Sequence, residues 1–437
     1  MKTQKKTTDK IHIITLGCSK NTVDSEKLIS QLSANNLIIE HNVEKTTARN
    51  IIINTCGFIS DAKQESIDTI LLYANAKKAG KIDNLFVIGC LSERYAKDLK
   101  QEIPEVDQFF GVNNIENIVK GLGYNYRDSL LGERVVSTPK HYAYLKISEG
   151  CDRGCAYCAI PLIRGKHVSL PIEQLVEEAT LLANSGVKEL ILIAQDLSYY
   201  GKDLNGKLML PQLVDKLSEI NGIEWIRLHY TYPAGFPNDI LAIIQNNPKV
   251  CKYLDIPFQH ISNNMLKIMR RSFTKEKSLE LIAKFRKEVP GLTLRTTLLV
   301  GHPGETDQDF DELLDFVRQI RFDRLGVFTY SHEEDTYSYK KYKDDVPDEV
   351  KMKRANEIMQ LQQQISEEIN FNKIGKEFKT IIDRKEGEYY IGRTQADSPE
   401  VDNEVLIESS NIKLKIGEFY RIKITKAREF DLFGEII

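Results

Sequence analysis

Three cysteines within eight positions are the residues of this chain with the clearest capacity for chemistry. They are Cys151, Cys155 and Cys158, in the stretch SEGCDRGCAYC at 148–158, with the spacing C-x3-C-x2-C. Thiolates on one short loop can converge on a single metal ion or cluster, and soft thiolates select zinc or iron–sulfur clusters. Three thiolates leave a tetrahedral site one ligand short. An open metal position of this kind is where a substrate or cosubstrate binds.

Two simpler interpretations of the loop compete with this one. A structural zinc site would need a fourth Cys or His, and His167, nine residues after Cys158, is the nearest candidate. The three thiols could also be inert and buried. We favour an iron–sulfur cluster with one open iron, because the ligand count of the loop is three rather than four.

A second set of cysteines lies near the N-terminus. Cys18, Cys56 and Cys90 end the apolar runs TLGC, INTC and VIGC, and they are 38 and 34 residues apart, about one βα unit each time. Parallel strands end at one edge of their sheet, where ligands gather. We therefore expect these thiols to meet in space and to hold a second cluster, rather than to be three buried core residues. A glycine near each cysteine lets the backbone come close: Gly17, Gly57 and Gly89.

The elements expected around this second set form a first domain. Between residues 11 and 136 the apolar runs IHIITLGC, RNIIINTCG and NLFVIGC alternate with helical stretches. Apolar strands separated by helices are typical of a parallel sheet covered on both faces. The sequence predicts an α/β domain over 1–136 with a flavodoxin-like sheet. The seventh thiol, Cys251, has no partner nearby in the sequence and is interpreted as a core residue.

Six more strands are expected between residues 142 and 331. The candidates are AYLKIS, ELILIAQD, IEWIRLHY, YLDIPF, LTLRTTLLVG and RLGVFTYS, with helical stretches between most of them. Six βα units fit a partial (βα)6 barrel, because a complete eight-unit barrel would need two further strands. The loop at 148–158 follows the first of these strands, on the side where barrel enzymes place their chemistry.

The last part of the chain changes character. A helix is expected at about 347–370, with apolar residues at helical spacing, and it would complete a domain over 137–370. Five short strands follow, FKTIIDR, YYIGRT, EVLIES, YRIKITKAREF and FGEII, which predict a small antiparallel β-barrel over 371–437.

The composition limits the classes of partner. The net charge of −3 creates no strong field toward nucleic acid or a membrane. No apolar run approaches the roughly 20 residues of a membrane helix, and IHIITL is too short for a signal peptide. We therefore expect a cytoplasmic protein with no membrane partner. In that reducing compartment, seven cysteines are metal ligands or buried thiols rather than disulfides.

The cysteine loop, with Tyr157 directly before its third cysteine, resembles the signature of the radical S-adenosylmethionine (SAM) superfamily. In that superfamily the methionine part of SAM ligates the open iron of a 4Fe–4S cluster. An electron from the cluster then cleaves SAM to a 5′-deoxyadenosyl radical, which abstracts a hydrogen atom. The resemblance implies that the missing fourth ligand is the cosubstrate. Tyr157 is a candidate for contact with the adenine ring; the alternative is that it packs only on the barrel.

The order of the three parts narrows the resemblance. A three-cysteine N-terminal domain, a radical SAM barrel and a small β-barrel together resemble the radical SAM methylthiotransferases over nearly the whole chain. In that family a second cluster carries the inserted sulfur, and SAM also supplies the methyl group. The resemblance implies SAM, a C-terminal TRAM-like module and an electron donor such as flavodoxin or ferredoxin. It also implies two 4Fe–4S clusters, at Cys18, Cys56 and Cys90 and at Cys151, Cys155 and Cys158.

Short motifs favour one branch of that family. The stretch LGCSKNTVDSE at 16–26 is similar to the RimO-like pattern LGCPKNxVDSE, and CDRGCAYCAIPLIRG and DIPFQHIS agree with it. That branch modifies the β-carbon of an aspartate in small-subunit ribosomal protein twelve, giving 3-methylthioaspartate. The chain departs from the family pattern at Ser19, where Pro is usual, and at His302, where Phe is common. Neither departure touches a proposed iron ligand.

Two alternatives remain beside this interpretation. The MiaB-like branch modifies isopentenylated adenosine in transfer RNA, and a non-catalytic zinc or iron–sulfur protein could dock on ribosomes. Residues 371–437 carry 12 Lys and Arg against 13 Asp and Glu, a net charge of −1. A domain that grips RNA is usually basic, so this balance favours a protein partner.

Two polar residues of the predicted barrel are further candidates for cofactor binding. Gln195 follows the second barrel strand and could contact SAM. Arg295 lies in the strand LTLRTTLLVG, where an inward arginine needs a partner. That partner could be a carboxylate of SAM or of the substrate; the alternative is an arginine that faces the surface.

Overall fold

The computed structural model describes residues 10–437 apart from 113, 131 and 411. The chain divides into two compact units. The first contains the residues up to 137 together with 149–152 and 159–168, and the second contains the others. The division passes through the cysteine loop, so that Cys151 belongs to the first unit and Cys155 and Cys158 belong to the second.

The first unit contains a five-stranded parallel sheet in the order β2-β1-β3-β4-β5. This is the flavodoxin-like order, and it confirms the predicted fold of this part. The edge strands β2 and β5 had not been predicted, because they are short and only partly buried. The strands are β1 (Lys10–Thr15), β2 (Ile38–His41), β3 (Asn50–Thr55), β4 (Asn84–Gly89) and β5 (Gln108–Phe109).

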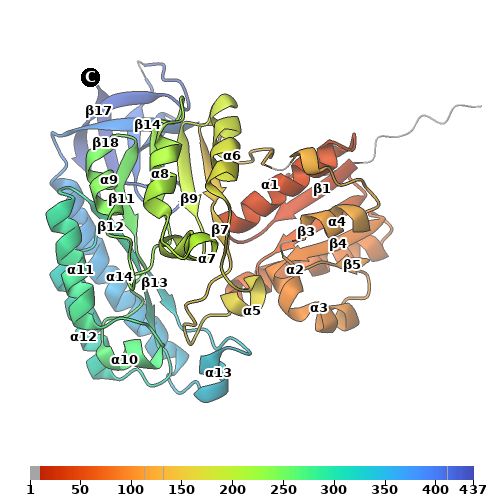
Figure 1. Cartoon of the computed structure of the whole chain (residues 1–437), viewed down its shortest axis with the longest axis horizontal. Coiled ribbons are helices and arrows are strands. Elements are labelled where there is room, and N and C mark those ends of the chain that lie inside the picture. The colour runs from red at the N-terminus through yellow and green to blue at the C-terminus, as the bar shows by residue number, and fades with distance from the viewer. Residues whose placement is uncertain (1–9, 113, 131, 411) are drawn as a thin grey trace, which may run out of the picture. The chain divides into compact units, whose positions relative to one another are not determined.

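Helices cover both faces of this sheet, as the red and orange part of Figure 1 shows. Successive side chains of a strand point to opposite faces. Ile51 and Ile53 pack with Ile70 of one helix, whereas Ile52 packs with Leu28 of another on the other face. The helices are α1 (Ser19–Ser33), α2 (Ser60–Lys78), α3 (Cys90–Glu102), α4 (Ile115–Gly121) and α5 (Ile160–Arg164), with a 3-10 turn at Asp128–Leu130.

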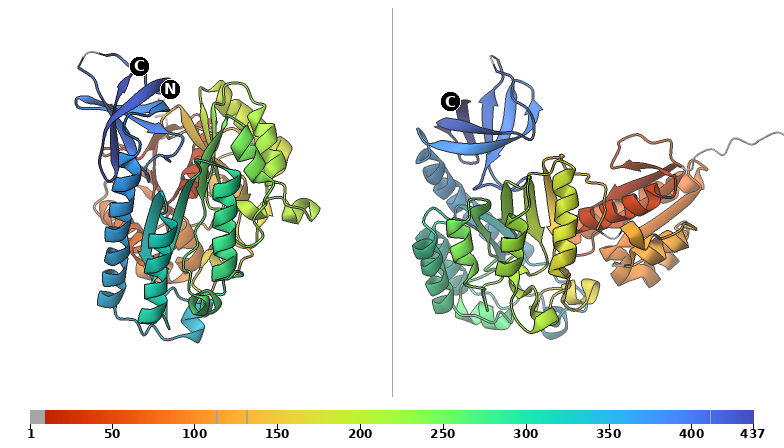
Figure 2. Two further views of the ribbon diagram at one scale, coloured as in Figure 1. Left: turned by 90° about the vertical axis from the view of Figure 1, so that its left-hand side faces the viewer. Right: turned by 45° about the horizontal axis from the view of Figure 1, so that its top comes forward.

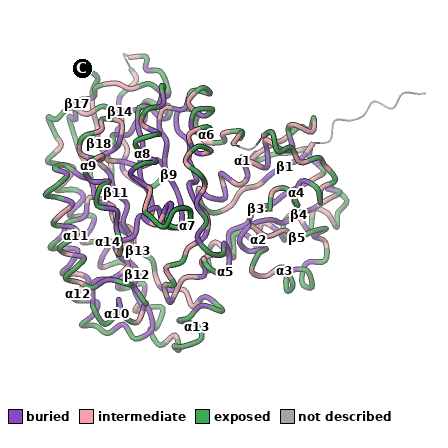
Figure 3. The backbone as a smooth tube through the Cα atoms, in the orientation of Figure 1, coloured by how far each residue is buried: buried purple, intermediate pink, exposed green. Residues whose placement is uncertain are grey.

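The second unit contains a six-stranded parallel sheet in the order β13-β12-β11-β10-β9-β6. All six predicted strands are present, and the sheet is the partial barrel that six βα units can form. Figure 3 shows that these strands are largely buried, except for the edge strand β13, which is mostly half-buried. They are β6 (Tyr142–Lys146), β9 (Glu189–Ile193), β10 (Trp225–Leu228), β11 (Val250–Asp255), β12 (Thr293–Val300) and β13 (Arg324–Thr329), and the short strands β7 (Ser148–Glu149) and β8 (Val168–Ser169) flank the cysteine loop.

Helices connect the strands of this sheet, and the last helix leads to the C-terminal strands. Helix α14 (Asp348–Phe371) begins after Pro347, where proline is compatible with a helix start, and it buries Ile358 and Ile365, as the sequence predicted. The other helices are α6 (Ile172–Asn184), α7 (Lys202–Asn205), α8 (Leu210–Ser218), α9 (Ile240–Asn246), α10 (Asn263–Ile268), α11 (Lys275–Glu288), α12 (Asp307–Ile320) and α13 (Tyr337–Lys341), with a 3-10 turn at Leu197–Tyr199.

The C-terminal strands form a closed barrel in the order β14-β15-β16-β18-β17, drawn in blue in Figure 2. Four neighbouring pairs are antiparallel, as predicted, but β16 and β18 run parallel. Five strands cannot alternate in direction all the way around a closed barrel, so one pair has to be parallel. The strands are β14 (Glu377–Glu386), β15 (Tyr389–Thr394), β16 (Glu404–Glu408), β17 (Phe419–Ala427) and β18 (Asp431–Ile436).

Buried ion pairs join this barrel to the six-stranded sheet. Glu189, the first residue of β9, accepts hydrogen bonds from Arg227 of β10 and Arg393 of β15, each at 2.8 Å. Arg393 also binds Asp383 of β14, which contacts His141 at 2.7 Å. These contacts lie at the N-terminal ends of the barrel strands, which leaves the C-terminal ends for the cysteine loop. No helix in the described part of the chain is long and apolar enough to cross a membrane.

Candidate active site

The three N-terminal cysteines follow three neighbouring strands of the first sheet. Cys18 follows β1 and caps helix α1, Cys56 directly follows β3, and Cys90 begins helix α3 directly after β4. Because the order of the sheet is β1-β3-β4, these three positions share one edge, as the sequence predicted. Two of the three cysteines, Cys18 and Cys90, lie at the start of a helix.

Glycines allow the three cysteine segments to approach one another. A Cβ atom on Gly17 would lie 2.7 Å from Cβ and 3.0 Å from Sγ of Cys56. A Cβ atom on Gly57 would lie 2.7 Å from the carbonyl carbon of Cys90. The segment of Cys18 therefore lies against Cys56, and the segment of Cys56 lies against Cys90. No side chain larger than hydrogen fits at either glycine without displacing the next cysteine.

The thiols of this set differ in exposure. Cys18 is exposed, whereas Cys56 and Cys90 are buried. Burial is the main cause that raises the pKa of the Cys90 thiol to about 12, and the nearby thiols of Cys18 and Cys56 raise the pKa further, while Arg164 lowers it. The site is thus open to solvent on the side of Cys18 and dry on the side of Cys90.

The motif at 16–26 builds the surroundings of these thiols. The Asn21 side-chain amide donates hydrogen bonds to the carbonyl oxygens of Leu16 and Thr55, and so joins the ends of β1 and β3. Its Oδ1 accepts a hydrogen bond from Arg164 at 2.6 Å. Asp24 accepts another from Arg164 at 3.0 Å. The residues that carried the sequence resemblance therefore hold the strand ends and orient an arginine beside Cys90.

Arg164 is a site residue that the sequence analysis did not identify. Its Nη2 lies 3.5 Å from Sγ of Cys90, and the residue is 5% exposed. Its signal in the sequence is the stretch IPLIRG at 160–165, in which Arg164 lies six residues after Cys158, but the sequence alone does not show which thiol an arginine on that segment contacts.

Residues 153–158 of the cysteine loop lie at the C-terminal end of the barrel strands. Arg153 forms an ion pair with Asp196, three residues after the end of β9. The backbone N–H of Ala156 donates to the carbonyl of Met269, and its carbonyl accepts from the backbone N–H of Ser338. These residues of the loop are thus fixed to three elements of the barrel.

Two thiols of the loop lie close to a buried arginine. Cys155 and Cys158 are half-buried, and the backbone N–H of Cys158 donates to the carbonyl of Cys155, which turns the loop. Nη1 of Arg271 lies 3.3 Å from Sγ of Cys155. In the first unit, the backbone N–H of Cys151 donates to the carbonyl of Gly165. Arg271 is the second site residue that the sequence analysis did not identify, since MRRSFT carries no known spacing to a cysteine.

The other predicted site residues lie in different surroundings. Tyr157 packs its ring against Met269, Leu299 and Tyr330, so the barrel wall holds the ring. Gln195 is half-buried and lies two residues after β9, at the same strand ends as residues 153–158.

Arg295 lies instead in the first half of β12, where it pairs with Asp255 at 3.2 Å and Asp402 at 3.3 Å. Its guanidinium therefore already has two carboxylate partners, and its contacts give no support to a role in binding SAM.

The donor chemistry of both sets fits an iron–sulfur cluster. Within residues 10–437, apart from the three that the structure does not describe, no three His, Cys, Asp or Glu side chains already stand in an arrangement that could hold a metal ion. The N-terminal thiols nevertheless interact with one another, and each set has one arginine beside a thiol. Cysteine thiolates are the donor set of iron–sulfur clusters.

His302, which stands where the family commonly has Phe, is fully buried near Tyr157. Its Nδ1 donates to the carbonyl of Pro303 at 3.0 Å, and its Nε2 accepts from the hydroxyl of Ser338 at 2.8 Å. These roles describe the neutral ring with its hydrogen on Nδ1. Burial is the main cause that lowers the pKa of His302 to about 4, and burial lowers the pKa of His260 to about 3.

The low pKa of His302 predicts a loss of stability in acid. The unfolded chain takes up this proton near the ordinary pKa of about 6.5, whereas the folded protein does so only near 4. The contribution of the neutral His302 ring to the free energy of unfolding is complete above about pH 6.5 and is lost as the pH falls toward 4. At pH 5 the loss from His302 is about 2 kcal/mol.

Urea unfolding of the wild type and of His302→Phe at pH 7.5 and pH 5 measures this contribution. The wild type should lose about 2 kcal/mol more than the variant between the two pH values. An equal loss in both proteins would show that His302 is not neutral in the folded state.

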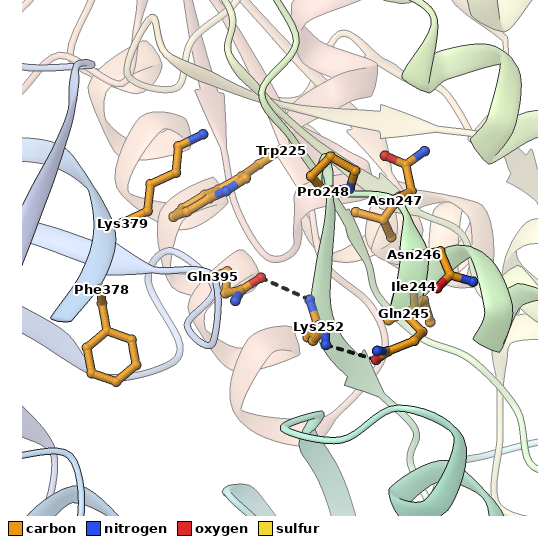
Figure 4. Close-up of a pocket in the computed structure, with 11 residues that line it drawn as sticks. Trp225, Ile244, Gln245, Asn246, Asn247, Pro248, Lys252, Phe378, Lys379 and Gln395 are labelled. Carbon is orange, nitrogen blue, oxygen red and sulfur yellow. Dashed lines mark hydrogen bonds between the residues drawn. The ribbon is translucent and has the colours of Figure 1, made fainter. Parts of the chain in front are cut away.

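A cavity of about 350 Å³ lies away from the cysteine loop, and Figure 4 shows the residues that line it. Its wall includes Trp225, Val250 and Phe378, at the starts of β10, β11 and β14. The backbone N–H of Lys252 donates to Gln395, and its Nζ donates to Gln245 at 2.8 Å. The cavity is at the N-terminal ends of the strands and is not part of the candidate site.

Comparison with sequence families matches all three parts of the chain. The radical SAM superfamily matches residues 145–317, the TRAM domain matches 374–437, and a family described as uncharacterized protein family UPF0004 matches 10–111.

Full-length relatives share more than half of their residues with this chain. "Ribosomal protein uS12 methylthiotransferase RimO" of Flavobacterium johnsoniae is 57% identical over 436 residues, which cover 100% of both chains. The protein of the same name from Phocaeicola vulgatus is 56% identical over 427 residues, or 98% of this chain and 99% of its own.

Solved structures share the fold at low sequence identity. The radical S-adenosylmethionine methyltransferase TsrM from Kitasatospora setae, with cobalamin and a [4Fe-4S] cluster bound, has a TM-score of 0.53 and 11% identity, over 74% of this chain and 75% of its own. The cobalamin-dependent S-adenosylmethionine radical enzyme OxsB has a TM-score of 0.52 and 14% identity, over 80% of this chain and 56% of its own. This likeness concerns the fold alone.

Proposed function

The chain belongs to the family of ribosomal protein uS12 methylthiotransferases named RimO, and from that premise we propose how its residues perform the family's reaction. The protein is a radical SAM methylthiotransferase that uses SAM and 4Fe–4S clusters. We assign Cys151, Cys155 and Cys158 to the cluster that binds SAM. The sulfur-donating cluster is assigned to a second set of thiols: Cys18, Cys56 and Cys90.

One observation carries this assignment. The second set follows β1, β3 and β4, which are neighbours in the parallel sheet, so three residues distant in sequence share one edge. Chance would not place cysteines at three adjacent strand ends and leave the other strand ends of the sheet without them. A sulfur donor separate from the SAM site needs a second binding place, and the shared edge supports placing it there.

The residues of the chain orient the reaction rather than carry it out. SAM and its cluster supply the one-electron chemistry that activates the β-carbon of the substrate aspartate. Arg153 and Ala156 fix residues 153–158 at the strand ends, and Arg271 donates to Cys155. Gln195 is the proposed polar contact of SAM, and Tyr157 is the proposed neighbour of the adenine ring.

Three domains are proposed along the chain, at 1–136, 137–370 and 371–437. The ranges matched by sequence families, 10–111, 145–317 and 374–437, each fall inside one of them, which supports the boundaries. The C-terminal domain is nearly neutral, and this supports a protein partner over RNA. Because the proposed substrate is a ribosomal protein, we place the enzyme in the cytoplasm, with a flavodoxin or ferredoxin as electron donor.

Product analysis tests this function. Reconstituted enzyme, SAM and a chemical reductant are incubated with small ribosomal subunits, with free uS12 and with transfer RNA, and peptides and nucleosides are examined by mass spectrometry. We expect 3-methylthioaspartate in uS12 together with 5′-deoxyadenosine. The two protein samples show whether free or assembled substrate is used.

Other products would contradict the proposal in distinct ways. Methylthiolated adenosine in the RNA, with unmodified uS12, would identify the transfer-RNA activity instead. Formation of no 5′-deoxyadenosine from SAM by the reduced, iron-loaded protein would favour a non-catalytic scaffold.

A further inference from the structure

Arg164 is a buried cation whose two guanidinium nitrogens have different partners. Nη1 lies 3.0 Å from Asp24 and 3.0 Å from both carboxylate oxygens of Glu149. Nη2 lies 2.6 Å from Oδ1 of Asn21 and 3.5 Å from Sγ of Cys90. The carboxylates of Asp24 and Glu149 bind Nη1, and Nη2 is therefore directed at the thiol of Cys90. All of these residues belong to the first unit.

The burial of this arginine has an energetic consequence. A buried guanidinium is costly unless it is paired, and the carboxylates of Asp24 and Glu149 supply the opposite charge. Because the ion pairs already satisfy the charge, the contact with Cys90 is not needed to stabilise Arg164 itself. The contact instead places a strong, oriented donor beside the sulfur of a cysteine that is almost completely buried.

We propose that Arg164 is a positioning residue of the N-terminal cysteine site, which donates a hydrogen bond to Sγ of Cys90 and thereby sets how firmly that site holds its cluster and at what potential the cluster is reduced. The inference rests on the proposed function, in which Cys90 is a ligand. Hydrogen bonds to ligating sulfurs and nearby positive charge raise the reduction potential of a cluster. Residues that orient a ligand from outside the coordination sphere also govern metal retention.

The barrel set of cysteines provides an internal comparison. Arg271 donates to Sγ of Cys155 at 3.3 Å and to the carbonyl of Pro257 at 2.6 Å. Its guanidinium also lies 4.3 Å from the centre of the Tyr232 ring. Each set of thiols therefore has its own arginine, and the two arginines act on different sites. A substitution of one arginine should leave the cluster at the other set unchanged.

The test uses two parent proteins that retain one set of cysteines each. Parent A carries Cys151→Ala, Cys155→Ala and Cys158→Ala. Parent B carries Cys18→Ala, Cys56→Ala and Cys90→Ala. Arg164→Gln, Arg164→Lys and Arg271→Gln are introduced separately into both parents. Each protein is reconstituted with iron and sulfide, and the iron content, the rate of iron loss to a chelator and the midpoint potential by EPR-monitored titration are measured.

In parent A, Arg164→Gln is expected to lose iron to the chelator about tenfold to a hundredfold faster, and its midpoint potential should move to a more negative value. Arg164→Lys keeps the charge but loses the two-branched geometry of the guanidinium. Its rate of iron loss and its midpoint potential should therefore lie between those of Arg164→Gln and of unsubstituted parent A. Arg271→Gln should change neither quantity in parent A. In parent B, Arg164→Gln should leave the rate of iron loss and the midpoint potential unchanged. Arg271→Gln should increase the rate of iron loss and make the midpoint potential more negative.

Loss of Arg164 removes a buried cation from beside Asp24 and Glu149, so the single variant could fail to fold. The double variant Arg164→Gln with Glu149→Gln removes one of these charges, and circular dichroism reports whether each protein is folded. Folded variants of parent A with unchanged iron loss and midpoint potential would overturn the role of Arg164. If unsubstituted parent A binds no iron, the cysteine assignment fails, and the role of Arg164 fails with it.

Discussion

Replacing Cys56 by alanine is expected to abolish methylthio transfer completely while the protein still cleaves SAM to 5′-deoxyadenosine. Cys56 lies in the middle of the three N-terminal positions, because β3 lies between β1 and β4 in the sheet. Two remaining thiols cannot hold a cluster that needs three protein ligands. The barrel set, by contrast, keeps all its ligands. Liquid chromatography of SAM products and mass spectrometry of uS12 measure the two activities in one sample.

The complementary variant is Cys151→Ala, which should lose both products, because SAM cleavage depends on the barrel cluster. Iron and sulfide analysis of anaerobically purified protein should find one cluster in each of these variants and two in the wild type.

Cys251→Ala is the control, because Cys251 is a buried thiol that packs with Trp225 and Tyr253 in the core. It should keep both clusters. Equal iron in Cys56→Ala, Cys151→Ala and wild type would refute the division of the six cysteines into two sites.

A second large effect is expected from Glu189→Ala, which should lower the free energy of unfolding by about 3–5 kcal/mol. Burial alone would raise the pKa of this carboxyl, but Arg393 and Arg227 hold it below its usual value. The carboxylate is therefore charged and fully buried between two arginines that are also buried. Its removal leaves both cations without their shared partner in a dry environment. Urea or thermal unfolding followed by circular dichroism measures the change.

Glu224→Ala is a matched control for this prediction. Glu224 also joins the six-stranded sheet to the C-terminal barrel, through Lys379 at 2.8 Å, but both side chains are about half exposed. A solvated pair contributes under about 1 kcal/mol. If the two variants lost similar stability, the buried ion pairs would not be what joins the barrel to the sheet.

The sequence predicted most of the fold, because the central strands carry strong apolar patterns. All six strands of the barrel sheet and all five of the C-terminal barrel were identified in this way. The edge strands β2 and β5 were missed, since edge strands need fewer buried residues and their patterns are weak. The parallel pairing of β16 and β18 follows from closure of the barrel, a property of the whole fold that no single strand shows.

The candidate site was predicted only in part. The cysteines were identified from the sequence, whereas the arginines beside them were not, because the arginines contact cysteines that are distant in the sequence. The cysteines could be grouped because their spacing, or their place at strand ends, is visible in the chain. Arg164 and Arg271 could not be linked to Cys90 and Cys155, since each contact joins residues 74 or 116 positions apart. For Arg295 the requirement for a partner was correctly stated, but the partners are Asp255 and Asp402 of the protein.

The buried ion pairs beneath the six-stranded sheet have a consequence for experiments on shortened chains. Arg393, Asp397 and Asp402 come from the C-terminal barrel, and they pair with charged residues of the sheet, Glu189, Arg324 and Arg295. A chain cut before β14 would leave Glu189, Arg295 and Arg324 without these partners. The C-terminal barrel thus closes the N-terminal ends of the strands of the six-stranded sheet. Loss of activity in such a truncated protein would therefore reflect the loss of these ion pairs. It would not be evidence that the barrel recognises the ribosome.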